Sequence, residues 1–287
     1  MPDNDTSRQP LPAERSQTMP LSLDVKGAAV VFPVVTSGTG PIFFCLGVRK
    51  SGSTLLNAIV RFLAKRNNVN EIDIPGTFFR KGLLARDWAD LDLSPLVLPQ
   101  NLYLGFRVLP PRLQQLEAFR SGRKVFMFRD PRDSLVSQYF SDAYSHGLPT
   151  ATGALGDGRE AFLEKRAKAL ATPIDDFVLA QAPILSRTME FYAPLLEDPA
   201  CLSLRYEEHL FQKRRLVAKI LRHFDWTAKP GQIEKLMGDV DVIPETEDKE
   251  RFLRKAIPGD HRQKLRPETI AKLDRIMAGV LQRYDYV

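Results

Sequence analysis

The chain has 287 residues, of which 44% are hydrophobic and 26% are charged. A chain of this length can bury a large core without disulfide or metal support, so we expect a folded protein with one main domain. Its apolar runs are shorter than the roughly 20 residues that a membrane-spanning helix needs. The net charge of +6 is spread along the chain without a long basic run or a base-stacking motif. This argues against a nucleic-acid partner and favours a small polyanionic ligand.

The N-terminal part of the chain is polar and rich in proline, with neither a secretory signal nor a membrane anchor. We therefore predict a disordered tail over residues 1–22 and a single domain over residues 23–287. The two cysteines, Cys45 and Cys201, each lie within an apolar run. That placement favours buried reduced thiols and predicts a cytoplasmic protein. No pattern indicates an oligomeric state.

Short runs of β-branched and aromatic residues alternate with segments of helical periodicity. They occupy residues 27–35, 41–47, 101–109, 124–130 and 200–206. Nearly continuous apolar strands separated by amphipathic helices are typical of a parallel sheet covered on both faces. The sequence therefore predicts an α/β fold with three layers, in which a parallel sheet of four or five strands lies between helices as in P-loop NTPases. A last helix is expected near Pro267.

The segment "LGVRKSGSTLL", residues 46–56, is close to the Walker A phosphate loop, G-x-x-x-x-G-K-[ST]. A serine stands where that loop has its lysine, and the lysine of this chain lies three places earlier. The segment follows a predicted strand and precedes a helix whose N-terminus carries partial positive charge. With Arg49 and Lys50 adding full charges, we expect the loop to bind an anion.

A second segment, "KVFMFRDPRDSLVSQYFS", passes from a predicted strand into a helix that Asp130 can cap and Pro131 can begin. Asp130 could hold magnesium in a kinase or ATPase that uses Mg-ATP. Alternatively, Arg129 and Ser137, about two helical turns apart, could form a second anion site. A non-catalytic module that binds a nucleotide or polyanion is a third interpretation.

Together these segments resemble the sulfotransferases that use 3′-phosphoadenosine-5′-phosphosulfate (PAPS) as sulfuryl donor. The loop "RKSGSTLL" resembles the family's 5′-phosphosulfate loop, and "FRDPRDSLVSQYFS" resembles its 3′-phosphate segment. "LSLRYEEHL" is similar to the strand and turn that pass near the adenine, and "FLRKAIPGDHRQKL" is similar to the arginine-lysine segment near the C-terminus. The matches follow the family's order over about residues 42–265.

The resemblance implies a PAPS-dependent sulfotransferase that releases 3′-phosphoadenosine-5′-phosphate (PAP) and needs no metal. It places Lys50 against the departing phosphate as the catalytic cation, and Tyr206 beside the adenine. The residues implied to bind the 5′-phosphosulfate are Arg49, Lys50, Ser51, Gly52, Ser53 and Thr54, followed by Leu55 where one branch of the family has tryptophan. Those implied to bind the 3′-phosphate are Arg129, Ser137, Arg254 and Lys255.

The base that accepts the acceptor's proton is left open. One branch of the family has a histidine in a Lys-Thr-His-Leu-Pro segment, but the corresponding run here, "GFRVLPPRL", has Val108 at that position. The loop is closer to that of the carbohydrate and protein-tyrosine sulfotransferases, where a carboxylate after the first helix acts as base. Asp73 would then be the base, with Glu71 as the alternative. His146, at the start of a Gly-rich loop predicted to be mobile over residues 145–160, is a third candidate.

The acceptor is expected to be a small molecule or carbohydrate that offers a hydroxyl group. Residues 70–90 and 145–160 would shape its site, but they show no pattern that names it. The four histidines lack metal-ligand spacing. His209 and His223 are expected on the surface.

Overall fold

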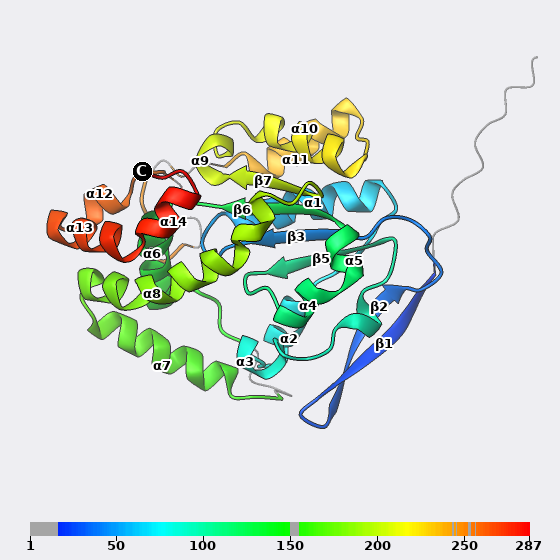
Figure 1. The fold of residues 1–287 in the computed structure, drawn as a ribbon, viewed down its shortest axis with the longest axis horizontal. Helices are drawn as coiled ribbons and strands as arrows, with labels where there is room; N and C mark the ends of the chain where they lie inside the picture. Colours follow the sequence, from blue (N-terminus) through cyan, green and yellow to red (C-terminus); the bar gives the residue numbers. More distant parts are fainter. Residues whose placement is uncertain (1–16, 150–154, 243, 245, 252–253, 256) are drawn as a thin grey trace, which may run out of the picture.

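The computed structural model describes residues 17–149, 155–242, 244, 246–251, 254–255 and 257–287 (Figure 1). At its centre is a five-stranded sheet with the strand order β4-β5-β3-β6-β7. Every neighbouring pair in this sheet is parallel. The strands are β3 Phe43–Gly47, β4 Asn70–Ile72, β5 Asn101–Phe106, β6 Arg123–Phe128 and β7 Cys201–Arg205. The predicted α/β class and parallel sheet are confirmed.

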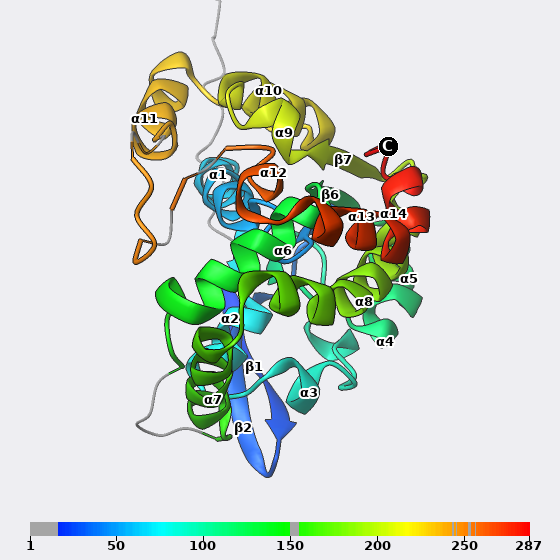
Figure 2. The same ribbon diagram turned by 90° about the vertical axis from the view of Figure 1, so that its left-hand side faces the viewer.

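Helices cover both faces of the sheet, because the side chains of each strand alternate between two cores. Phe43 and Cys45 belong to one cluster of buried residues, and Phe44 and Leu46 belong to the other. The first cluster includes side chains of α1 Ser53–Arg66, α9 Tyr206–His209, α10 Lys213–Phe224 and α11 Pro230–Val240. The second includes side chains of α2 Ile74–Arg80, α3 Ala85–Trp88, α4 Pro111–Gln115, α5 Glu117–Ser121, α6 Pro131–Phe140, α7 Gly158–Ala171, α8 Ile174–Tyr192, α13 Pro267–Ile276 and α14 Ala278–Arg283. The predicted three layers are present, with α10 and α11 on one side of the sheet and α2 and α7 on the other (Figure 2).

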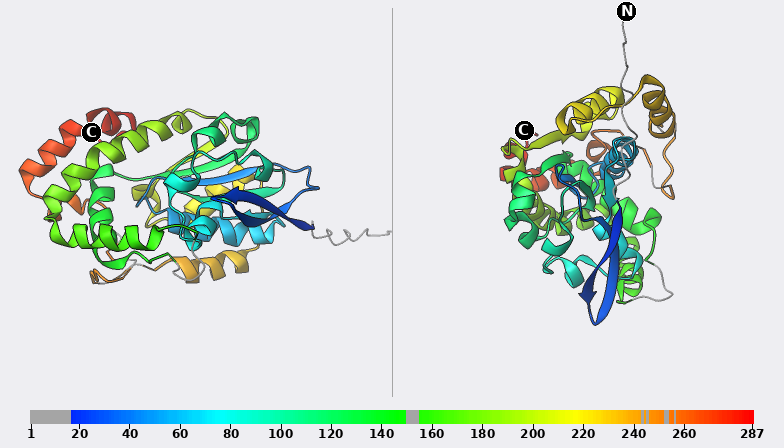
Figure 3. Two further views of the ribbon diagram at one scale, coloured as in Figure 1. Left: turned by 90° about the horizontal axis from the view of Figure 1, so that it is seen from below. Right: turned by 90° about the vertical axis from the view of Figure 1, so that its right-hand side faces the viewer.

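The run at residues 27–35 is not part of this sheet, contrary to the expectation from the sequence. Its strand, β2 Ala28–Val35, pairs antiparallel with β1 Thr18–Val25 in a separate hairpin. Phe32 is buried whereas the adjacent Val31 is 53% exposed. A strand with one solvated face suits an antiparallel hairpin better than the covered interior of a parallel sheet. The hairpin lies at the end of the molecule opposite α13 and α14 (Figure 3).

Strand β1 also corrects the predicted boundary of the N-terminal tail. Residues 18–22, which were expected in the tail, form the first part of this strand. Residues 1–16 lie outside the described part of the chain. The fifth strand of the parallel sheet is instead β4, which was not predicted because three residues are too few to show a periodic pattern.

The segments that follow β3, β5, β6 and β7 meet at one edge, because the carboxyl ends of parallel strands lie together. The glycine loop leads from β3 into α1, and α9 follows β7 directly. Helix α6 begins at Pro131, and the carboxylate of Asp130 accepts a hydrogen bond of 2.9 Å from the backbone N–H of Arg132. The predicted cap of this helix is confirmed. Helix α6 and the short α12, His261–Lys264, both lie toward this edge (Figure 2).

A π-helical turn over Ser141–Ser145 follows α6 and leads into the segment predicted as a loop. Such turns are frequent at functional sites. Residues 150–154 of that segment lie outside the described residues, and α7 begins already at Gly158. The predicted C-terminal helix is present as α13, followed by α14.

Cys45 and Cys201 are free thiols, as predicted. Cys45 is buried and Cys201 is partly buried, and desolvation raises the pKa of both thiols. Across the described ranges, no helix is both long enough and apolar enough to span a membrane.

Candidate active site

A pocket of about 330 Å³ opens where the carboxyl ends of the strands meet. Its walls come from the glycine loop and α1, the residue after β5, α6, the residue after the π-helical turn, α9, the start of α10, the end of α11 and the segment before α12. The pocket thus gathers segments that are far apart in the sequence. The predicted site residues that line it are Arg49, Lys50, Gly52, Ser53, Thr54, Leu55, Arg129, Ser137, His146, Tyr206, Arg254 and Lys255.

Ser51 is an exception, because its side chain supports the loop and does not face the pocket. The residue is fully buried, and its hydroxyl oxygen lies 2.6 and 2.8 Å from the carbonyl oxygens of Val48 and Met127. Met127 belongs to β6, so this contact ties the loop to the neighbouring strand. The Ser51 hydroxyl is thus used within the protein, and the predicted contact of this residue with a bound donor stays a prediction.

Gly52 allows the loop to enter α1 directly beneath a tyrosine ring. Its φ of +87° lies in the left-handed region, and a Cβ at this position would lie 2.5 Å from Cδ2 of Tyr206. Helix α1 has no side-chain cap and no acidic residue in its first turn. Its first N–H groups therefore remain available to an anion, as expected of a phosphate loop.

Three cations lie close together at this loop. Nη2 of Arg49 is 2.9 Å from the carboxylate of Asp142. Arg107, the first residue after β5, donates to the hydroxyls of the first two residues of α1 over 3.3 and 3.4 Å. Burial, followed by the charges of Arg49 and Arg107, lowers the pKa of Lys50 to about 8. A polyanion bound here would relieve this repulsion and favour the protonated form of Lys50.

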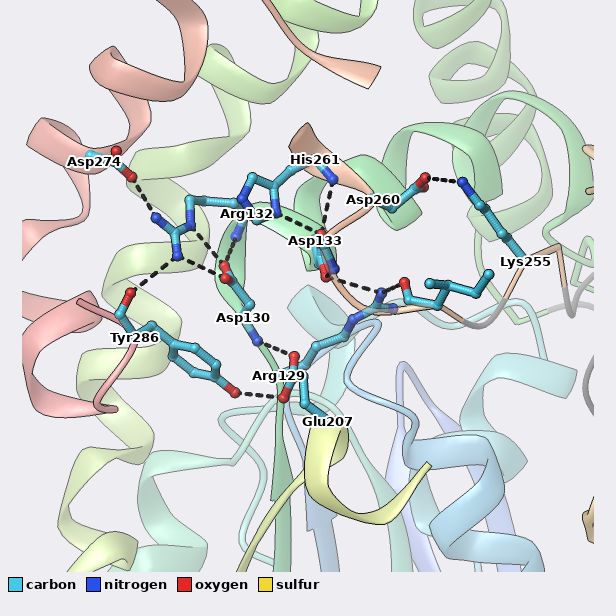
Figure 4. Close-up of polar contacts among 12 residues, drawn as sticks. Arg129, Asp130, Arg132, Asp133, Glu207, Lys255, Asp260, His261, Asp274 and Tyr286 are labelled. Atoms are coloured by element: carbon cyan, nitrogen blue, oxygen red, sulfur yellow. Dashed lines mark hydrogen bonds and ion pairs between the residues drawn. The ribbon is translucent and has the colours of Figure 1, made fainter. Parts of the chain in front are cut away.

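Arg129 is the centre of a second cationic group (Figure 4). Its guanidinium lies 4.7 Å over the ring of Tyr206, and Nη2 donates to the carbonyl oxygen of Ile257 over 3.2 Å. The residue is only 7% exposed. Its Nε is buried without a hydrogen-bond partner in the described structure. A buried donor left in this way is costly unless a ligand supplies an acceptor.

Asp133 of α6 joins Arg129 to the segment before α12. Its Oδ1 accepts hydrogen bonds from the ring Nδ1 and the backbone N–H of His261 over 2.7 and 3.0 Å, and Oδ2 accepts from the N–H of Gly259 over 2.7 Å. Burial alone would raise the pKa of Asp133, but the hydrogen bond from His261 and the charge of Arg129 lower it to about 2. The carboxylate therefore stays ionised and holds these elements together.

Arg254 and Lys255 complete the second group, and both pair with the buried carboxylate of Asp260. The Nζ of Lys255 lies 3.1 Å from that carboxylate. Arg254 also pairs with Glu247, and its guanidinium lies 4.1 Å over the ring of Phe140. Acidic partners thus partly balance the two cations.

The two candidate carboxylate bases do not line the pocket. Asp73 caps α2, and its two oxygens accept hydrogen bonds of 2.9 Å from the N–H of Gly76 and from Nη2 of Arg61. Glu71 lies on β4 with half of its side chain exposed, 3.5 Å from Nε of the same arginine. Both carboxylates are therefore engaged outside the cavity.

His146, the third candidate, does line the pocket. Its Nδ1 lies 2.7 Å from the carbonyl oxygen of Gly147. Because a carbonyl only accepts hydrogen bonds, Nδ1 carries the ring proton and Nε2 is left as the acceptor. Burial and the nearby loop cations lower the pKa of His146 to about 4. Its ring packs against Phe79 and Phe162, with centroids 5.8 and 4.8 Å away, and these two rings also contact each other.

The remaining histidines lie outside the pocket walls. His209 is 2% exposed, so the prediction of a surface position is wrong for this residue. It is buried because α9 packs on α10, where the Nζ of Lys219 lies 3.3 Å from its Nε2. His223 is partly buried.

Asp130, the residue considered as a magnesium ligand, is engaged by its own helix. Its two carboxylate oxygens accept hydrogen bonds of 3.0 and 2.8 Å from the guanidinium of Arg132. Within the described residues, no group of three or more His, Cys, Asp or Glu side chains is arranged to hold a metal ion. The local geometry of Asp130 is therefore that of a helix cap.

Two cations in the pocket wall were not predicted. Arg107 lies at the carboxyl end of a predicted strand, where ligands of parallel α/β sheets usually bind, so its position could have identified it. Lys213 is 3% exposed and lies 2.7 Å from the carboxylate of Asp241. Its role in the wall depends on how α10 packs against α11, and local sequence carries no signal for that contact.

A family profile described as "Sulfotransferase domain" matches residues 41–285. The match covers most of the 287 residues, so the chain belongs to the sulfotransferase family. The predicted class of enzyme, a PAPS-dependent sulfotransferase, is confirmed at this level. No curated protein sequence matches the chain significantly.

A solved structure agrees with the fold. The structure of mouse sulfotransferase SULT7A1 complexed with PAP is similar with a TM-score of 0.58 and 13% identity, over 88% of this chain and 87% of that chain. Retinol dehydratase in a complex with retinol and PAP aligns with a TM-score of 0.43 and 17% identity, over 93% and 91% of the two chains. At these identities, the first comparison supports the fold alone.

Proposed function

We propose that the pocket binds PAPS and transfers its sulfuryl group to a hydroxyl of a small-molecule or carbohydrate acceptor. The observation that supports this best is the meeting of two cationic groups in one cavity. The loop supplies Arg49 and Lys50, and a second set is centred on Arg129. A donor with separate negative charges at its 5′ and 3′ ends matches two such groups.

In this proposal, the N-terminus of α1 and the cations of the loop hold the 5′-phosphosulfate. Arg129 and Ser137 hold the 3′-phosphate together with Arg254 and Lys255. The buried Nε of Arg129 would gain an acceptor in this way. Tyr206, whose ring packs between Gly52 and Arg129, would lie beside the adenine.

During transfer, the acceptor oxygen forms a bond to sulfur while the bond from sulfur to the bridging phosphate oxygen breaks. PAP leaves with that electron pair, so negative charge grows on the bridging oxygen. The ammonium of Lys50 stabilises this charge, as a preorganised cation does in other group-transfer sites. Arg107, beside the first hydroxyls of α1, adds positive charge to the same region.

We propose that Nε2 of His146 accepts the proton of the acceptor hydroxyl. This ring lines the pocket, is neutral at neutral pH and keeps Nε2 as an acceptor. Asp73, by contrast, caps a helix and pairs with Arg61. Phe79 and Phe162 pack against the histidine, and such rings can also pack against an aromatic acceptor or the face of a sugar.

We also propose that residues 18–287 act as one cytoplasmic domain. The two hydrophobic clusters share the strands of a single sheet, which supports one cooperative unit. The free thiols of Cys45 and Cys201 suit a reducing compartment.

Replacing Lys50 with alanine should lower turnover by roughly 10²- to 10³-fold, the usual cost of losing one preorganised electrostatic donor. Transfer of labelled sulfate from PAPS to a panel of phenols, alcohols and sugars provides the measurement. Lys65→Ala, on the exposed side of the last turn of the same helix, is the matched control and should retain activity. Near wild-type turnover by Lys50→Ala would reject the assignment. If the wild-type protein binds PAP without transferring sulfate to any acceptor, the non-catalytic module is favoured instead.

PAP binding should weaken as the pH rises above the Lys50 pKa of about 8. The anion prefers the ammonium form, so binding raises this pKa and takes up a proton near pH 8 to 9. Calorimetry in two buffers of different ionisation enthalpy measures that proton. Lys50→Arg should remove the alkaline loss, because a guanidinium stays protonated. An affinity that is constant from about pH 7 to pH 9.5 would contradict this account.

His146→Gln should lower turnover by roughly 10²-fold or more while PAP affinity changes little, because only proton transfer is lost. His223→Gln, outside the pocket, serves as control. Asp73→Asn and Glu71→Gln should keep most activity. If Asp73→Asn abolishes transfer and His146→Gln does not, Asp73 is the base and the histidine only contacts the acceptor.

A further inference from the structure

The C-terminal end of the chain contacts the segment that carries Arg129. The hydroxyl of Tyr286 donates a hydrogen bond of 2.9 Å to Oε2 of Glu207. The other carboxylate oxygen of Glu207 accepts a hydrogen bond of 3.0 Å from the backbone N–H of Asp130. Asp130 is the residue directly after Arg129, so a single carboxylate links the C-terminal tyrosine to the peptide that orients the arginine (Figure 4).

Further contacts hold Tyr286 in this place. Its ring packs edge-on against Phe128, with centroids 6.2 Å apart, and the guanidinium of Arg205 lies 4.7 Å over the same ring. Its carbonyl oxygen accepts a hydrogen bond of 3.1 Å from Nη2 of Arg132. Phe128 ends β6 and Arg205 ends β7. The tyrosine therefore bridges the carboxyl ends of the two strands that lead to Arg129 and Tyr206.

The direction of Arg129 is set by its backbone together with three side-chain contacts among the described residues. These are a long contact of 3.5 Å to Asp133, a hydrogen bond to the carbonyl oxygen of Ile257 and a stacking contact on Tyr206. Glu207 follows Tyr206 directly in α9. Fixing Glu207 thus fixes the peptide that directly follows Arg129.

The hydroxyl of Tyr286 is suited to this role because it keeps its proton. Burial and the neighbouring Glu207 raise the pKa of Tyr286 above its usual range. The hydroxyl therefore acts as a donor to the carboxylate across the physiological range, and a hydrogen bond to a charged acceptor is stronger than a neutral one.

We propose that Tyr286 is a positioning residue for recognition of the donor's 3′-phosphate, acting through Glu207 on Arg129. This inference rests on the proposed role of Arg129 in holding that phosphate. Tyr286 lies outside the cavity wall and acts by fixing the arginine. Its loss should therefore weaken the binding of nucleotides that carry a 3′-phosphate, and it should leave the binding of nucleotides without one unchanged.

The experiment compares the affinities of PAP and of adenosine 5′-monophosphate, which lacks the 3′-phosphate, by direct and displacement calorimetry. Tyr286→Phe removes only the hydroxyl. It should weaken PAP binding by about 5- to 10-fold, which is less than the tenfold or more that a hydrogen bond to a charged group contributes, because the effect reaches the nucleotide indirectly. Binding of the monophosphate should stay within about twofold. A variant that merely loosens the fold would weaken both nucleotides alike.

Tyr284→Phe is the matched control, because its hydroxyl donates to the carbonyl oxygen of Met189 in α8 over 2.7 Å and not to Glu207. This variant should leave the ratio of the PAP affinity to the monophosphate affinity unchanged, even if the midpoint of its thermal unfolding falls. Arg129→Gln calibrates the assay and should reduce the ratio by more than about tenfold.

The outcomes separate the two proposals. If Arg129→Gln leaves the ratio unchanged, Arg129 does not hold the 3′-phosphate, and the role of Tyr286 falls with it. If Arg129→Gln lowers the ratio but Tyr286→Phe does not, or lowers it no more than Tyr284→Phe does, the inference about Tyr286 is wrong while the site assignment stands.

Discussion

The structure depends on holding many positive charges together in one partly buried pocket. Seven lysine and arginine side chains line the described walls, against a single carboxylate, that of Asp239. Like charges in a site of low dielectric raise one another's free energy. Burial, and after it the charges of Arg49 and Arg107, lower the pKa of Lys50. Such a pocket is stable only if other groups compensate the repulsion while the ligand is away.

Buried carboxylates behind the walls provide much of that compensation, and each also joins separate segments of the chain. Asp142 pairs with Arg49 of the loop and with Lys165 of α7. Asp133 joins Arg129 to the backbone before α12. Asp260 pairs with Arg254 and Lys255. Removing one partner of such a buried pair leaves an uncompensated charge, so these acids matter for stability as well as for orientation. The same residues that assemble the fold at this edge therefore set the geometry of the cations.

Sequence alone predicted the parts of this arrangement that are local. The capped start of α6 is one such short pattern with a physical meaning. The glycine loop, the pair Arg129 and Ser137, and the pair Arg254 and Lys255 are others, and the structure places these in one pocket. The inward position of the Ser51 hydroxyl was not predicted, because a loop pattern does not show which hydroxyls turn inward. The composition of residues 27–35 predicted a strand of the buried sheet, but in β2 exposed side chains alternate with buried ones.

What sequence could not predict depends on contacts between distant segments. In the sequence, Asp142 and Lys213 look like any other charged residues. Their ion pairs form only when α7, α10 and the loop are folded together. The surroundings of the three candidate bases have the same origin. Position along the chain favoured Asp73, but folding pairs that carboxylate with Arg61 and turns His146 toward the cavity. The aromatic rings around His146 likewise come from separate elements.

The central claim is that one pocket holds a nucleotide by both its 5′ and its 3′ ends. A crystal structure of the protein with PAP bound tests this most directly. The account predicts the 5′-phosphate at the N-terminus of α1 beside Lys50, and the 3′-phosphate within hydrogen-bond distance of Arg129 and Ser137. It also predicts the adenine beside Tyr206. A nucleotide whose 3′-phosphate points away from Arg129, or which binds outside this cavity, would contradict it.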